Sequence, residues 1–115
     1  MSGSESRKHP RVRPDPSAPV RVDIMGNGFL EVLSARDISV GGLGVSVKHK
    51  FEGCDTNSEV DLIVTLGRAR PFKTRGVIRH ASNDFFGVQF TALAPEHEKA
   101  IEAYVATRLG RKAAG

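Results

Sequence analysis

The sequence lacks several residue types on which whole classes of protein depend. Among its 115 residues there is no tryptophan, one tyrosine and one cysteine. A lone Cys54 excludes an internal disulfide and a cysteine metal cluster, and its polar surroundings indicate an incidental thiol. No run of about 18 apolar residues is present, which predicts no membrane-spanning helix. The basic N-terminus is not followed by an apolar segment, so we expect no secretory signal and a cytoplasmic protein.

Catalytic motifs are also missing. Ser39 lacks the flanking glycines of a GxSxG nucleophile turn, and no P-loop pattern occurs. The glycines at 41, 42 and 44 lie between two expected strands instead of opening a helix, so they form no dinucleotide fingerprint. The histidines are scattered, without metal-ligand spacing, at His9, His49, His80 and His97. We therefore expect a protein that is not an enzyme and that uses no metal or cofactor.

Positive charge is present and unevenly distributed. The chain carries a net charge of +4, and residues 1–13 hold four basic residues against one acidic residue. Such a basic segment suits an anionic partner, for example a nucleotide, a nucleic acid or an acidic protein surface. A solvated tail without a partner is the alternative.

Alternation of apolar and polar residues predicts strands through most of the chain. Asn27-Gly28 is a strong hairpin signal between the first two, because both residues tolerate positive φ. Six closely spaced strands followed by one helix predict a mainly β protein, a small six-stranded antiparallel β-barrel with a C-terminal helix. The expected strands cover residues 20–24, 29–38, 43–47, 60–66, 71–81 and 86–90.

The two ends of the chain differ from this pattern. Residues 1–19 contain four prolines and predict a flexible basic arm. Pro95 suits a first helical turn, and an apolar stripe of Ile101, Tyr104, Val105 and Leu109 follows at helical spacing, with Gly110 as the expected stop. The expected organisation is thus an arm at 1–19, a barrel with its helix at 20–110 and a disordered tail at 111–115.

Two short constellations could bind a ligand. Arg7 and Arg11 are four residues apart, and their guanidinium groups can bond phosphate oxygens or the O6/N7 edge of guanine. Asp37, Ser39 and Gly42 form an Asp-x-Ser-x-x-Gly pattern, in which the carboxylate can accept from guanine's N1–H and N2–H₂ groups. The alternative for the second constellation is structural, because Asp, Ser and Gly also cap turns.

Together these residues resemble the two signatures of the PilZ family, RxxxR and [D/N]xSxxG, in the family's order. The resemblance runs from about Arg7 to Leu109 and includes the strand-like stretches 41–45, 76–79 and 87–90. It implies a six-stranded barrel that binds the bacterial second messenger cyclic di-GMP. In the family, the arm folds across the barrel when the ligand binds, and the Pro-rich stretch 10–19 fits such a flap.

The resemblance also implies roles for individual residues. Arg7 and Arg11 would clamp phosphate and guanine, Asp37 and Ser39 would read the guanine edge, and Gly42 would shape the turn. Lys8 is a further candidate. His80 is the nearest counterpart of an aromatic residue that stacks on guanine in some relatives, although an ordinary solvent-facing residue is the alternative.

The sequence does not determine how many ligand molecules bind or which cellular process the protein controls. Ser6, where some relatives carry an arginine or a bulky apolar residue, leaves room for an intercalated ligand pair but lacks the extra arginine that would hold it. A single-domain receptor would act through a partner protein in motility, exopolysaccharide synthesis or transcription. Two other functions remain, a nucleic-acid-binding small barrel and a PilZ-like protein adaptor without ligand.

Overall fold

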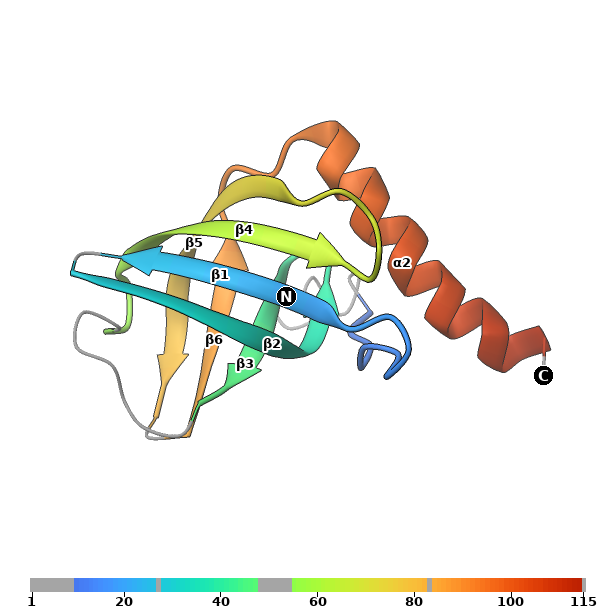
Figure 1. Cartoon of the computed structure of the whole chain (residues 1–115), viewed down its shortest axis with the longest axis horizontal. Coiled ribbons are helices and arrows are strands. Elements are labelled where there is room, and N and C mark those ends of the chain that lie inside the picture. Colours follow the sequence, from blue (N-terminus) through green and yellow to red (C-terminus); the bar gives the residue numbers. More distant parts are fainter. Residues whose placement is uncertain (1–9, 27, 48–54, 83, 115) are drawn as a thin grey trace, which may run out of the picture.

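The chain folds into one closed antiparallel barrel with a helix at one end (Figure 1). The computed structural model describes residues 10–26, 28–47, 55–82 and 84–114. The strands close in the order β1-β2-β3-β6-β5-β4, which confirms the predicted six-stranded barrel. Their bounds are β1 Val20–Gly26, β2 Phe29–Ser39, β3 Gly42–Ser46, β4 Glu59–Leu66, β5 Phe72–Ala81 and β6 Phe85–Phe90, and the helix α2 spans Pro95–Ala114.

The period-two pattern explains how the barrel fills its interior. Along β1, Val20, Val22 and Ile24 are fully buried while Arg21 between them is exposed. A similar alternation recurs on β4, β5 and β6, because successive side chains of a strand point to opposite faces. Gly28 follows β1 with φ of 87°, as a tight hairpin requires. The fully enclosed side chains of the barrel are chiefly Val20, Val22, Ile24, Ile38, Leu43, Val45, Leu62, Val64 and Ile78.

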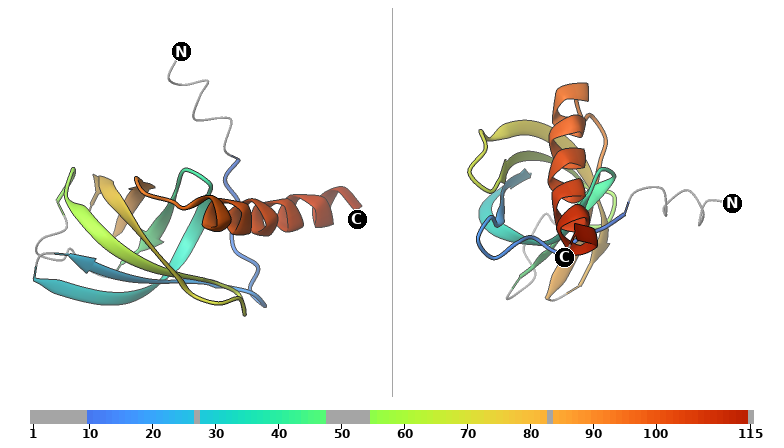
Figure 2. Two further views of the ribbon diagram at one scale, coloured as in Figure 1. Left: turned by 90° about the horizontal axis from the view of Figure 1, so that it is seen from above. Right: turned by 90° about the vertical axis from the view of Figure 1, so that its right-hand side faces the viewer.

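Helix α2 covers one end of the barrel and continues past it (Figure 2). Ile101 and Val105 are buried, so the expected apolar stripe docks on the barrel. Leu109 does not belong to it, because 42% of this residue is exposed. The helix continues to Ala114, so Gly110 is not its stop and residues 111–114 are helical where the sequence predicted a tail. No helix in the described ranges combines the length and apolarity needed to cross a membrane.

Residues 10–19 lie against the barrel and the helix. Val12 is buried and exchanges two backbone hydrogen bonds of 3.0 Å with Ile38 of β2. Farther along, the Asp15 carbonyl accepts from the Ala18 amide at 2.9 Å, which closes a turn before β1. The predicted flexible arm therefore does not extend to these residues. Its remaining part, residues 1–9, lies outside the described residues.

Two side chains of α2 hold this segment in place. The Tyr104 hydroxyl accepts from the Asp15 amide at 3.1 Å and donates to the Ala18 carbonyl at 2.5 Å. Arg108 donates to the Arg13 carbonyl at 2.7 Å and lies 3.5 Å from the Asp15 carboxylate. The helix thus satisfies backbone groups that a proline-rich segment cannot pair with itself.

Removing the Tyr104 hydroxyl tests this attachment. We expect Tyr104→Phe to lower the free energy of unfolding by about 1–3 kcal/mol, because a part-buried amide and a carbonyl lose their partner. Urea denaturation measures the change. Thr107→Val is the control, since that hydroxyl bonds only within the exposed helix face and its loss should change stability by less than about 0.5 kcal/mol. Equal stability of both variants would contradict the attachment.

Candidate functional site

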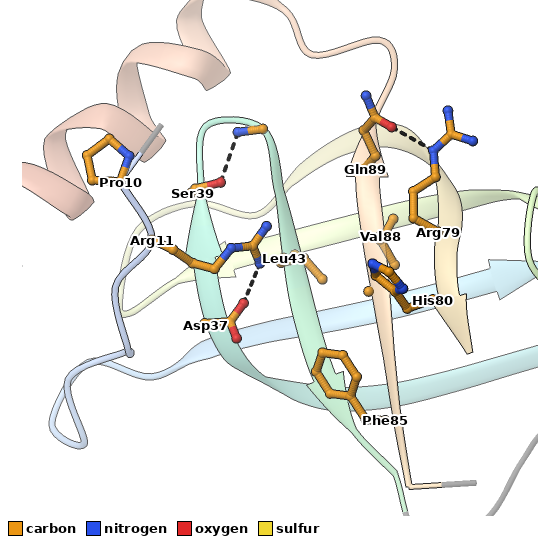
Figure 3. Close-up of a pocket in the computed structure, with 12 residues that line it drawn as sticks. Pro10, Arg11, Asp37, Ser39, Leu43, Arg79, His80, Phe85, Val88 and Gln89 are labelled. Carbon is orange, nitrogen blue, oxygen red and sulfur yellow. Dashed lines mark hydrogen bonds and ion pairs between the residues drawn. The ribbon is translucent and has the colours of Figure 1, made fainter. Parts of the chain in front are cut away.

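A pocket of about 890 Å³ lies on the outer face of four neighbouring strands, β2, β3, β6 and β5, with the segment before β1 at its edge (Figure 3). Residues from distant parts of the sequence meet there, including Arg11, Asp37, Ser39 and His80 of the sequence-predicted set. Gly42 is not part of its lining, and Arg7 and Lys8 lie outside the described residues. The lining residues are Pro10, Arg11, Asp37, Ser39, Gly41, Leu43, Arg79, His80, Phe85, Gly87, Val88 and Gln89.

One row of residues crosses all four strands of the pocket. In register, Asp37 of β2 faces Gly44 of β3, Gly44 faces Gly87 of β6, and Gly87 faces His80 of β5. Neighbouring strands lie about 4.8 Å apart, so Asp37 and His80 stand about 14 Å apart with only glycines between them. The row therefore has a polar side chain at each end and bare backbone in the middle.

A β-bulge stands beside each end of this row. The register of β2 with β3 shifts immediately before Asp37, and the register of β5 with β6 shifts immediately before His80. The extra residues are Arg36 and Arg79, both exposed. A bulge places two successive side chains on one side of a strand and is common beside binding sites. Each bulge here adds a guanidinium group to the outer face.

The Arg11 guanidinium lies on the Asp37 carboxylate. Its Nη1 atom is 2.5 Å from Oδ1 of Asp37, and the two residues are 26 positions apart in the chain. The backbone pair between Val12 and Ile38 brings them close together, because Val12 directly follows Arg11 in the chain and Ile38 directly follows Asp37. Arg36 is also 3.9 Å from the other carboxylate oxygen. Two cations on one acid leave this end of the pocket net positive, which favours an anionic ligand.

Ser39 closes the turn between β2 and β3. Its side-chain oxygen accepts a hydrogen bond from the Gly41 amide at 3.1 Å, and the residue is 2% exposed. Ser39 therefore caps this turn, as the structural alternative for the second constellation predicted. Ser39 also lines the pocket. A ligand would have to use the hydrogen-bonding positions of the same hydroxyl that the turn leaves available.

Gly42 is required by strand packing. A Cβ atom there would lie 2.1 Å from the Val88 carbonyl oxygen across the β3–β6 pair. Among the described glycines, Gly28 and Gly67 have positive φ and Gly42 does not. The structure thus explains this motif residue by the close approach of two backbones, not by the turn conformation that the resemblance implied.

Three residues that the sequence reasoning did not single out complete the site. Arg79 donates to the Gln89 side-chain oxygen at 2.7 Å and to the Asn57 side-chain oxygen at 2.9 Å, which fixes its guanidinium beside His80. Phe85 lies beneath the Arg36 guanidinium, 4.2 Å from its ring centroid. The break in alternation at 79–80, two polar residues in succession, was the available sequence signal for the bulge. No pattern pointed to Phe85 or Gln89.

Comparisons with known proteins agree with this architecture. A protein of Aquifex aeolicus, described as uncharacterized, is 33% identical over 114 residues, covering 90% of this chain and 50% of that protein. The chain spans about half the length of this relative. Among solved structures, the K. pneumonia MrkH complex with c-di-GMP has a TM-score of 0.78 at 17% identity, over 95% of this chain and 55% of that one. The PilZ domain of Escherichia coli YcgR with c-di-GMP has a TM-score of 0.71 at 16% identity, over 93% of both chains.

The family is established by the sequence itself. The family model of the PilZ domain matches residues 5–107, which include both constellations and the whole barrel. The resemblance that was drawn from Arg7, Arg11, Asp37, Ser39 and Gly42 is thereby confirmed. This chain belongs to the PilZ domain family.

Proposed function

We propose that this protein is a cytoplasmic receptor for cyclic di-GMP that performs no catalysis of its own. The observation that carries the proposal is the meeting of Arg11, Asp37 and Ser39, from separate segments, in one pocket with positive surroundings. Two structural neighbours, MrkH and the YcgR domain, are described as complexes with c-di-GMP. Family membership and the geometry of the pocket support the same ligand.

The pocket offers the groups that such a ligand needs. Its phosphates and the Hoogsteen edges of its guanines are acceptors, which suit the guanidinium groups of Arg11 and Arg79. The guanine N1–H and N2–H₂ groups are donors, which suit the Asp37 carboxylate, with Ser39 beside it. His80 provides a ring for stacking. Arg7 and Lys8 remain proposed contributors from outside the described residues.

The Arg11–Asp37 ion pair does not block the site. An ionised carboxylate has about four lone-pair positions and a guanidinium has five N–H donors. The one hydrogen bond between them uses Oδ1 and Nη1, so most of this capacity remains. We propose that guanine binds Asp37 while Arg11 stays on it, which orients both groups before the ligand arrives and reduces the entropy lost on binding.

The signal would reach a partner protein through residues 10–19 and α2. Arg11 lies in the pocket, and the segment that it begins is held by Tyr104 and Arg108 of the helix. A ligand that binds Arg11 therefore stabilises one end of a chain of contacts that reaches the helix surface. We propose that this surface, and residues 1–9, present the bound state to the partner.

Calorimetric titration tests the receptor function. We expect the protein to bind cyclic di-GMP and to bind GMP, ATP and a short oligonucleotide much more weakly, because only the first presents two guanines on two linked phosphates. The fitted stoichiometry separates one bound molecule from an intercalated pair. A flat isotherm with folded protein at high micromolar ligand would refute the proposal.

Two double variants show whether the calorimetric signal arises from ligand binding in this pocket. The double variant Arg11→Ala with Asp37→Ala removes one positive and one negative charge, and we expect it to weaken binding strongly while leaving it measurable. The matched control is Arg21→Ala with Asp23→Ala, which removes another exposed ion pair, of 3.0 Å, on β1. Tighter binding of the oligonucleotide would favour a nucleic-acid function. Binding of no ligand at all would favour a protein adaptor.

A further inference from the structure

Gly44 and Gly87 face each other in the middle of the pocket row, and the fold explains only the first. A Cβ atom on Gly44 would lie 2.9 Å from the Phe85 ring and 3.0 Å from Oδ1 of Asp37. The Phe85 ring therefore occupies the space above Gly44, and a side chain at this position would have to displace that ring.

Gly87 has no such reason in the fold. A Cβ atom there would meet only the His80 ring, at an ordinary contact distance of 3.7 Å. Its φ is not positive, since Gly28 and Gly67 are the described glycines with that conformation. A glycine inside a strand weakens the strand and often marks a place where another group approaches the backbone. The fold would accept a side chain at this position and would gain from it.

The surroundings of Gly87 indicate what approaches it. Gly87 pairs with His80 on one side and, on the other, with Gly44, over which the Phe85 ring lies. The His80 and Phe85 rings both belong to the pocket lining (Figure 3). Arg79 is at the same edge, with its guanidinium directed by Gln89 and Asn57. A bare strip of backbone between two rings, with a fixed donor group at its edge, fits a flat heteroaromatic ring that carries acceptors.

We infer that Gly87 is the seat of a purine base, a position whose missing side chain lets one base of the ligand lie on the β6 backbone between His80 and Phe85. The inference rests on the proposed function, because it assigns one guanine of cyclic di-GMP to this strip. Arg79 then bonds the O6/N7 edge of the seated base. The Asp37 end of the row serves another guanine, about 10 Å from Gly87 because two strand spacings separate them.

Substitution of Gly87 separates ligand clearance from stability. We expect Gly87→Val to fold with a melting temperature equal to or above that of the wild type and to bind cyclic di-GMP about 10- to 100-fold more weakly. Ser34→Val is the control, because it adds a branched side chain at an exposed position of β2 paired with Arg21 of β1. That variant should bind as the wild type does. If Gly87→Val does not fold, Gly87→Ala decides by the same two measurements.

Nuclear magnetic resonance gives a second, direct measurement. With the glycines labelled, we expect the Gly87 α-protons to move upfield on saturation with cyclic di-GMP, as a base ring lies over them, and to show cross-relaxation with guanine H8. Calorimetric binding without this shift, or wild-type affinity of a folded Gly87→Val or Gly87→Ala protein, would overturn the seat and leave the receptor function standing. Absence of binding to the wild-type protein would overturn the receptor function, and the seat with it.

Discussion

Replacing Gly42 by alanine is expected to lower the free energy of unfolding by at least about 3 kcal/mol. The new Cβ atom would have to occupy a point 2.1 Å from the Val88 carbonyl oxygen. That neighbour is backbone in a paired strand, so it cannot rotate away as a side chain would. Relief requires β3 and β6 to separate, and these two strands are neighbours in the closed barrel. Thermal and urea denaturation measure the loss.

Gly110→Ala is the matched control for this change. A Cβ atom on Gly110 has no neighbour within 4 Å and the residue lies within α2, so alanine should raise stability slightly through its better helix propensity. A Gly42→Ala protein that melts as the wild type does and merely loses cyclic di-GMP would contradict the packing role. It would show that Gly42 acts on the ligand site and not through strand packing.

Replacing Arg11 by alanine is expected to weaken cyclic di-GMP binding by about 10- to 100-fold, because each hydrogen bond to a charged group contributes about 1.5–3 kcal/mol. Arg11→Lys should restore little of this affinity, since an ammonium group cannot reproduce the planar fork of donors. The stability of the protein should change little. Half of the Arg11 side chain is exposed, at 51%, and exposed ion pairs contribute about 1 kcal/mol or less.

A double-mutant cycle refines this result. Arg11→Ala, Asp37→Ala and the double variant, titrated with the same ligand, give the interaction energy between the two residues. We expect the combined loss to be smaller than the sum of the single losses, because each residue orients the other in the pocket. Strict additivity would mean that the ion pair plays no part in binding. Arg21→Ala, on β1 and outside the pocket lining, should bind as the wild type does.

The barrel could be predicted from the sequence because its information is local. Val20, Val22 and Ile24 alternate with polar residues, and the same pattern recurs in each later strand, so strand number and inward faces follow from the period alone. The Asn27-Gly28 turn and the Pro95 helix start are likewise encoded within a few residues. Strand order was not predicted, because alternation does not say which strands are neighbours.

The site was only partly predictable because its geometry depends on register. The motif residues were identified, but the row from Asp37 to His80 exists only through the pairing of four strands. The only sequence signal of each bulge is a pair of successive polar residues, Arg36-Asp37 and Arg79-His80. Attachment of residues 10–19 was missed because prolines indicate an irregular segment without saying what holds it. Val12, whose partner Ile38 is remote, gave no local signal.

The assembly of the pocket from several strands has a consequence for how ligand binding affects the folding equilibrium. The pocket takes residues from the segment before β1 and from β2, β3, β5 and β6, so a chain lacking any of these, whether partly synthesised or partly unfolded, holds no complete site. The ligand would therefore bind the native state alone. At a concentration 100 times its dissociation constant, such a ligand adds about 2.7 kcal/mol to the stability of everything that must be folded to bind it. That addition applies to the whole cooperative unit, so the second messenger would protect the entire domain from unfolding and proteolysis.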